Sequence, residues 1–510
     1  MPRLAAALSF LLVLGTAAPG QTSEGQIEQA FRAGQQAMQQ HEFARAAEQF
    51  QKVLALDPTI VEAEVNLGLA YQSLFDYDSA VHHLTKALHE RPNLLGPNLI
   101  VGMDYLKLGS AQKAVPYLRQ ALKLAPSNQD AHEALASSYL AQEDFRSAAE
   151  QFRQIALLDS DKPDALFKLG HEYLDLAARL AYRGAHLYPD SAWGHRFLGD
   201  LLFQRERWDD AAKEYQKALN VAPKQAGLHT ALGNTYLKQG KKDEAETEFR
   251  LERQLASLKP RKDLAGSQLL QLGKEHFSAQ QYQLAADVLA QVQGINAENE
   301  EASYWLERTY QGQGAEAYAQ LQESFPDSWR THQLRAEGYA LRQKFDEAVK
   351  ELQTALDLRP NEPELHDALG EVYFDSQDND AAERELEKAL ALDPSRTHAL
   401  YLLGRLYVQE RETEKALPYL ERAVRLQPDL AEANSLLGTA YLRMGQFAKA
   451  IPKLERAAGS DHYGNVHYQL YEAYRKLGQP KLAQKELTLS QNLRRSYLER
   501  DQAVIMGSPQ

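Results

Sequence analysis

The sequence contains no cysteine among its 510 residues. It therefore has no disulfide framework, no thiolate zinc site, no cysteine nucleophile and no lipid anchor on cysteine. Three common enzyme motifs are missing as well: the GxxxxGKS/T phosphate loop, the HExxH zinc helix and the GxSxG nucleophile turn. Carboxylate pairs such as Glu383 and Glu385 lie in charge-rich stretches typical of solvated helix faces. The sequence thus predicts a protein that is not an enzyme and has no cofactor and no metal site.

An excess of basic charge is also absent. The 57 Lys and Arg residues are outnumbered by 70 Asp and Glu residues, which gives a formal net charge of −13. An acidic surface argues against nucleic acid and against anionic membranes as partners. The charges of both signs are interspersed, so most of them are expected on solvated helix faces.

The dominant feature of the sequence is a unit of 34 residues. In the stretch from Ser395 to Pro428, two runs with apolar residues at helical spacing are separated by a polar break at 410–413. Pro428 ends the second run, because proline cannot donate a helical hydrogen bond. A helical hairpin this small cannot bury its own apolar faces, so it must stack on copies of itself.

Glycine, alanine and proline recur at fixed places of this unit. Gly in the middle of a helix costs about 1 kcal/mol relative to Ala, so a recurring Gly indicates close approach of two helices. The recurring Ala is expected to have the same role on the second helix. The glycines that keep the step of 34 are Gly34, Gly68 and Gly102, and then Gly370, Gly404 and Gly438.

These residues make the chain resemble the tetratricopeptide repeat (TPR) family. The resemblance rests on a Leu-Gly pair followed by Tyr, a small residue twelve positions after the Gly, and the closing Pro. It implies an all-α fold: a solenoid in which antiparallel helix pairs form a right-handed superhelix whose concave surface binds peptides or other proteins. The residues that carry it include Leu67, Gly68 and Tyr71, Leu403, Gly404 and Tyr407, Leu437, Gly438 and Tyr441, and the small residues Ala80, Ala416 and Ala450.

Two units are shorter than the others. Only 26 residues separate Pro163 from Pro189, and a second short unit ends at Pro326. The first reads as a hairpin that has lost its inter-helix turn, leaving one longer, bent helix through Leu176 to Leu187. The sequence around Pro189 recurs 137 positions later around Pro326, so a block of three full units and one short unit is duplicated. Each short unit is expected to change the local twist, because each unit orients the next.

The predicted organisation is therefore about twelve full units and two short ones. A signal peptide (1–20) precedes N-terminal units (21–163), central units that include both short ones (164–326) and C-terminal units (327–495). A capping helix end and a frayed tail (496–510) follow.

The first 20 residues predict export. Arg3 precedes an apolar run from Leu4 to Leu14 and then small residues as far as Gly20. About eleven apolar residues are too few to span a bilayer, which needs about twenty, so a cleaved signal is expected rather than a membrane span. Cleavage after Gly20 would leave a periplasmic or secreted bacterial protein that begins at Gln21.

Six units place a histidine four positions before the Gly place. Stacked imidazoles could bind a metal or sense pH. The alternative is that each ring fills space between the paired helices, and we favour it because the rings are dispersed over different helices. The six residues are His132, His195, His229, His332, His366 and His467.

Candidate partner-binding residues follow from the resemblance, since positions two, five, nine and twelve of the first helix face the concave groove in the family. In the first three units these places hold Phe31, Met38, Val65, Leu69, Leu99, Met103 and Leu106, and in later units they include Trp193, Arg196 and Arg405. The Lys and Asn set with which some family members hold a C-terminal carboxylate is not reproduced. The apolar places could take an apolar or amphipathic segment of a partner, or they could pack against neighbouring first helices.

Three functions remain open. The first is a non-catalytic scaffold that binds a peptide or protein outside the cytoplasm. The second is a subunit that assembles a secretion or polysaccharide-export complex. The third, less favoured, is a hydrolase or transferase with its site in the groove, which clustered, strongly shifted carboxylates in a concave pocket would support.

Overall fold

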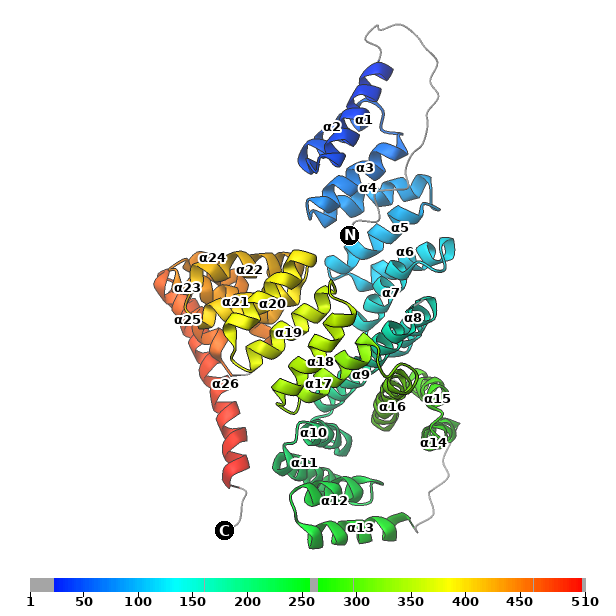
Figure 1. Cartoon of the computed structure of the whole chain (residues 1–510), viewed down its shortest axis with the longest axis vertical. Helices are drawn as coiled ribbons and strands as arrows, with labels where there is room; N and C mark the ends of the chain where they lie inside the picture. Colours follow the sequence, from blue (N-terminus) through cyan, green and yellow to red (C-terminus); the bar gives the residue numbers. More distant parts are fainter. Residues whose placement is uncertain (1–22, 160, 257–264, 297, 462, 507–510) are drawn as a thin grey trace. The chain divides into compact units, whose positions relative to one another are not determined.

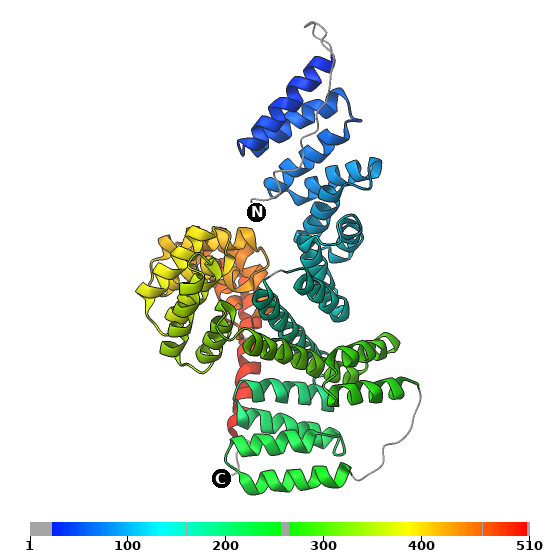
Figure 2. The same cartoon turned by 45° about the vertical axis from the view of Figure 1, so that its right-hand side comes forward.

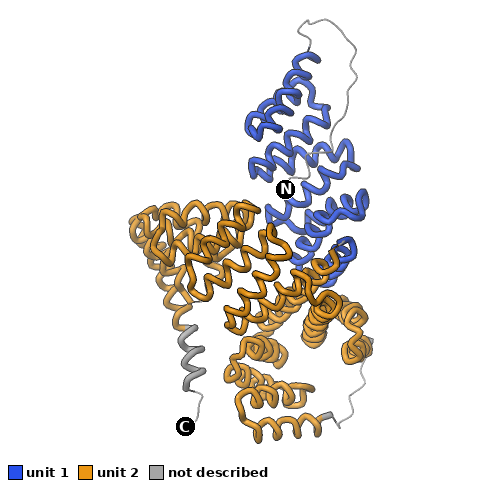
Figure 3. The backbone as a smooth tube through the Cα atoms, in the orientation of Figure 1, with its two compact units in different colours: residues 1–160 blue, residues 161–510 orange. Residues whose placement is uncertain are grey.

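The computed structural model describes residues 23–159, 161–256, 265–296, 298–461 and 463–506, and all of its regular structure in these ranges is helical. The predicted signal peptide and its cleavage site lie outside them. The chain divides into two compact units, unit 1 at 1–160 and unit 2 at 161–510 (Figure 3). No described helix is both long and apolar enough to cross a membrane.

Unit 1 consists of four helical hairpins (Figure 1). Each first helix is followed by a second helix of nearly equal length that packs against it. The pairs are α1 (Ser23–Gln39) with α2 (Phe43–Leu56), α3 (Val61–Ser73) with α4 (Tyr77–Glu90), α5 (Leu95–Lys107) with α6 (Ala111–Leu124), and α7 (Gln129–Ala141) with α8 (Phe145–Leu158).

Unit 2 contains eight hairpins and two long single helices. The single helices are α9 (Lys162–Leu187) and α16 (Glu300–Ser324). The hairpins between them are α10 (Ala192–Gln204) with α11 (Trp208–Val221), α12 (Leu228–Lys238) with α13 (Lys242–Ala256), and α14 (Ala265–Ser278) with α15 (Tyr282–Ile295). The remaining pairs are α17 (Trp329–Ala340) with α18 (Phe345–Leu358), α19 (Pro363–Asp375) with α20 (Asn379–Leu392), α21 (Thr397–Gln409) with α22 (Thr413–Leu426), α23 (Ala431–Arg443) with α24 (Phe447–Ala457), and α25 (Asn465–Lys476) with α26 (Pro480–Met506). The described chain therefore has twelve hairpins and two long helices, which confirms the expected twelve full and two short units.

The recurring glycine does bring two helices together. A Cβ on Gly68 would lie 2.5 Å from Cγ of Leu84, and a Cβ on Gly404 would lie 2.4 Å from Cδ2 of Leu420. In both hairpins the partner is the sixteenth residue after the Gly, on the second helix. These contacts confirm that the glycine is needed for close packing.

Every hairpin turns through one residue with a left-handed backbone, seven positions after the Gly place. Neither α9 nor α16 contains such a residue, so each continues as one helix, and the predicted loss of the turn is confirmed. The twelve turn residues are His41, Phe75, Gly109, Glu143, Glu206, Gly240, Gln280, Gln343, Gln377, Arg411, Gly445 and Gly478.

The two long helices pack against each other, although 112 residues separate Leu187 from Glu300 (Figures 1 and 2). The rings of Tyr173 and Tyr310 stack with their centroids 6.0 Å apart. These two tyrosines are equivalent residues of the duplicated blocks, because Tyr310 follows Tyr173 by 137 positions. The duplication is therefore visible as a local two-fold relation that passes between α9 and α16.

This relation means that the two short units exchange halves. A Cβ on Gly170 of α9 would lie 2.2 Å from Cε1 of Tyr318, on the second half of α16. In an ordinary hairpin Gly170 would meet the sixteenth residue after it, His186. The first half of α9 and the second half of α16 thus form one hairpin-like pair, and by the same relation the other two halves form a second pair.

The linear stacking expected from the sequence is wrong at this point. The helix α10 packs on α9, α15 packs on α16, and α17 contacts both long helices, α9 more extensively. The pair α9 and α16 is therefore a branch point from which α10 to α15 extend as a separate loop of helices. The long-range exchange overrides the simple rule that each unit stacks on the next.

We expect Gly170→Ala to destabilise the chain by about 1 to 3 kcal/mol, because the added methyl group overpacks against the ring of Tyr318. A double-mutant cycle with Tyr318→Ala, followed by urea unfolding, should show coupling between these distant positions. The matched control is His186→Ala, which should show no coupling with Gly170→Ala. Coupling to His186 and none to Tyr318 would mean that 162–187 folds back as an ordinary hairpin.

Candidate partner-binding surfaces

The predicted apolar residues of unit 1 form a surface that is part core and part open. Val65 and Leu99 are buried, whereas Leu69, Met103 and Leu106 are half-buried. Leu69 packs at the edge of the core that Val65 shares with Leu84. Phe31 and Met38 are half-buried beside Phe50, whose ring centroid lies 5.5 Å from that of Phe31. Val65 and Leu99 therefore support the surface, and the other five residues keep apolar area exposed.

A buried carboxylate, Asp104, lies next to this surface and was not identified from the sequence. Its Oδ1 accepts a 3.3 Å hydrogen bond from Gln72, and Oδ2 has no partner among the described residues. Burial raises the pKa of the Asp104 carboxyl to about 7, against the opposing effect of the Gln72 bond. The only signal in the sequence is an acid one residue after Met103 in an otherwise apolar helix.

The candidates Trp193 and Arg196 on α10 are covered by α16. The Arg196 guanidinium lies 4.1 Å from the ring centroid of Tyr304 and donates a 2.8 Å hydrogen bond to the carbonyl of Ala226. The ring of Trp193 lies 4.8 Å from that of Tyr304. With 6% of its surface exposed, Arg196 has little left to offer a partner.

The same contact encloses a buried acidic group. Glu307 of α16 is 2% exposed and occupies the Gly place of the second short unit. Burial, and then the charge of Asp200, raise the pKa of the Glu307 carboxyl to about 8. Asp200 itself accepts a 2.5 Å hydrogen bond from the hydroxyl of Tyr215. Sequence reasoning missed this cluster because its members lie more than 90 residues apart.

The equivalent face of α17 is covered in turn by α9. Arg330, which is 2% exposed, donates a 2.6 Å hydrogen bond to Asp164 and 2.7 and 3.0 Å bonds to Glu364. Its guanidinium also lies 4.5 Å from the ring centroid of Phe167. The first helix after each long helix is thus closed by the long helix of the other copy.

Arg405, the remaining candidate, stays half-buried on α21. Its guanidinium lies 4.7 Å from the ring centroid of Phe374 on α19. The predicted residues therefore do not form one site: the structure keeps a partly open apolar set in unit 1 and separates it from the three residues of unit 2.

The six histidines connect the two helices of their own hairpins. In each case Nδ1 lies 2.6 to 2.8 Å from a side-chain oxygen nineteen residues later, on the second helix. This geometry supports the space-filling role. The partners are Gln151, Glu214, Glu248, Glu351, Glu385 and Glu486. Within the described ranges, no group of three or more potential ligands could hold a metal ion.

Sequence models of the tetratricopeptide repeat match several segments of the chain. They cover residues 31–94, 102–156, 133–192 and 368–431, and also 407–462. A further model described as a TPR repeat matches residues 199–240 and 338–377. Together these segments span more than half of the chain. The chain is a tetratricopeptide repeat protein.

Solved TPR structures resemble this TPR chain only distantly. The TPR protein YrrB, described as having an unusual peptide-binding site, is 22% identical, with a TM-score of 0.32 over 36% of this chain and 95% of its own. The hetero-tetramer Cut9-Hcn1 of APC/C gives 17% identity and a TM-score of 0.29 over 90% and 96%. A TPR protein from Parabacteroides merdae gives 16% identity and a TM-score of 0.26 over 56% and 99%. No curated protein sequence matches significantly.

The buried acid predicts a specific pH dependence. The folded-state pKa of Glu307, about 8, lies above its ordinary value of 4.5, so folding favours the protonated form. The stabilisation is complete below pH 4.5 and is lost as the pH rises toward 8. We expect Glu307→Gln to remove this loss, a few kcal/mol, since one pKa unit corresponds to about 1.4 kcal/mol.

The measurement is urea unfolding of the wild type and the variant between pH 5 and pH 9. Glu316→Gln on the same helix is the control, because Glu316 is exposed, and it should leave the pH profile unchanged. Parallel profiles for the wild type and Glu307→Gln would contradict the raised pKa.

Proposed function

We propose that this TPR protein is a non-catalytic scaffold that binds a peptide or protein partner outside the cytoplasm. The observation that carries the proposal is the partly open apolar set in unit 1, Phe31, Met38, Leu69, Met103 and Leu106, on first helices whose cores are already complete. Apolar area that the fold leaves half-covered can be buried by a partner, at about 25 cal/mol per Å².

The chemistry of this set favours an amphipathic segment as the ligand. Leu69, Met103 and Leu106 lie on α3 and α5, and methionine adapts its shape to different apolar partners. Apolar anchors at helical spacing would fit such a surface, as in other complexes in which a helix binds in a groove. Asp104 is buried beside it, so the surface offers apolar contact rather than charge.

A catalytic alternative receives no comparable support. The carboxyls with strongly raised pKa values, Asp104 and Glu307, are 1% and 2% exposed and are enclosed by their own helices. A general acid or base must reach its substrate within hydrogen-bond distance. No observation favours a secretion or polysaccharide-export complex over another partner.

Affinity capture from an envelope extract tests the scaffold function, with the chain from Gln21 as bait. We expect Leu69→Glu with Met103→Glu to lose the captured partner, because a charge placed in an apolar contact weakens it by about tenfold or more. Leu56→Glu with Leu157→Glu is the matched control, since both leucines are exposed on second helices. Circular dichroism should confirm equal helicity. Retention of the same partner by all baits would refute the apolar surface.

The proposed location rests on residues 1–20, with the basic, apolar and small-residue parts of an export signal. After expression in a bacterium, mass spectrometry of the periplasmic fraction and the medium should find a chain that starts at Gln21. A chain that lacks residues 1–20 should stay in the cytoplasm. An uncleaved full-length chain in the cytoplasm would contradict export.

A further inference from the structure

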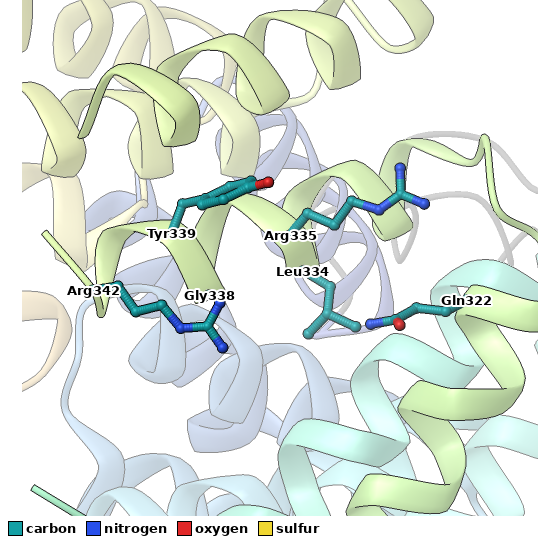
Figure 4. A pocket seen from close by; sticks show the side chains of 6 residues that line it. All are labelled: Gln322, Leu334, Arg335, Gly338, Tyr339 and Arg342. Carbon is teal, nitrogen blue, oxygen red and sulfur yellow. The ribbon is translucent and has the colours of Figure 1, made fainter. Parts of the chain in front are cut away.

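A pocket of about 320 Å³ lies between the end of α16 and the helix α17. It is lined by Gln322 of α16 and by Leu334, Arg335, Gly338, Tyr339 and Arg342 (Figure 4). The side chains of Leu334 and Gln322 point toward each other from the two helices. Pockets of this size are large enough for part of a ligand.

The polar groups of this pocket have no partner in the described part of the chain. The guanidinium groups of Arg335 and Arg342 make no ion pair there, and Gln322 makes no side-chain hydrogen bond. Arg335 and Arg342 are seven residues apart, two helical turns, so they lie on one face of the chain around α17. No carboxylate lines the pocket, although the protein as a whole is acidic.

The hydroxyl of Tyr339 shows that this lack of partners is unusual within the protein. In six hairpins the Tyr at the same place bonds to a side chain 19 to 24 residues earlier, on the preceding second helix. For Tyr339 the residue twenty positions earlier is Ala319, which has no polar side chain. The six tyrosines are Tyr71, Tyr139, Tyr236, Tyr407, Tyr441 and Tyr474.

The duplicated block provides an internal comparison. At the equivalent places, 137 residues earlier, Phe197 stands for Leu334, Leu198 for Arg335 and Leu201 for Gly338. Phe197 is buried there against Ala181 and Tyr304, with Leu201 packed beside it. A Cβ on Gly338, in contrast, would meet nothing within 4 Å. The first copy fills this space with apolar side chains, whereas the second leaves it open and lines it with cations.

We propose that the pocket binds a carboxylate of an acidic segment in the partner protein. Two guanidinium groups, a phenol hydroxyl and an amide supply donors, and charge-assisted bonds from Arg to carboxylate are the strongest of these. Leu341, adjacent to Arg342 and 88% exposed, supplies apolar contact beside the charge, which suits a peptide. The inference rests on the proposed scaffold function and adds a second contact, of opposite chemistry to the apolar surface of unit 1.

Fluorescence anisotropy with the full chain tests the proposal directly. The probes are a fluorescein-labelled peptide of alternating Ala and Glu with an amidated C-terminus, the same peptide with a free C-terminus, and a neutral Ala and Gln peptide. We expect the acidic peptides to bind and the neutral one not to bind. Equal binding of both acidic peptides assigns side-chain carboxylates, and binding of the free form alone assigns a chain terminus.

Variants then locate the site. Arg335→Ala with Arg342→Ala should weaken binding about tenfold or more, because it removes both charged donors. Gly338→Leu, which restores the residue of the first copy, should also weaken binding by filling the pocket. The control is Arg205→Ala with Arg384→Ala, two exposed arginines of unit 2 that change the net charge equally, and it should leave the Kd within about twofold.

A single thiol reports occupancy independently of affinity. Because the chain has no cysteine, Gly338→Cys places its only thiol in the pocket, and the acidic peptide should slow alkylation of that thiol by a maleimide. The proposal is overturned if the acidic peptide does not bind, if the control variant weakens binding as much, or if alkylation is unchanged. The scaffold function survives any of these results when the capture experiment still recovers a partner through unit 1.

Discussion

Close approach of two helices at a glycine is the contact on which this structure depends. It places a large side chain of one helix directly over the bare backbone of another, as Leu84 does over Gly68. The contact requires only that the two helices run antiparallel at the right distance, and it does not require that they be neighbours in the chain. This tolerance allows Gly170 to be covered by Tyr318, so that α9 and α16 complete each other's hairpins.

The repeat architecture could be predicted because its determinants are local. The Gly, the Ala twelve positions later and the turn residue all lie within one unit, so their spacing reveals the hairpin. The exchange between α9 and α16 could not be predicted in the same way. A hairpin within 162–187 and an exchange with 300–324 would use the same kinds of residues, and the choice depends on a contact between segments over a hundred residues apart. The duplication was visible, but the pairing of its two copies was not.

The candidate site was predictable to the same extent. Positions taken from the family locate apolar residues on first helices, and in unit 1 most of them keep exposed area. In unit 2 the exchange covers these positions, so that Arg196 packs on Tyr304 and Arg330 pairs with Asp164. Their burial follows from the long-range pairing, which is why sequence position alone gave them the wrong environment.

The two halves of the exchange are related by duplication but differ in chemistry. One pair sets Gly170 against Tyr318, and the equivalent positions are Glu307 and Ala181, where the larger residue is on the opposite helix. A similar volume is kept, but a carboxyl now lies in the core and must be protonated or paired. The pocket beside α17 shows the same divergence, since Leu334 and Gly338 give up volume that Phe197 and Leu201 occupy in the first copy. A duplicated contact needs only one copy to hold the branch together by packing, and the other can accept polar groups that a single copy could not.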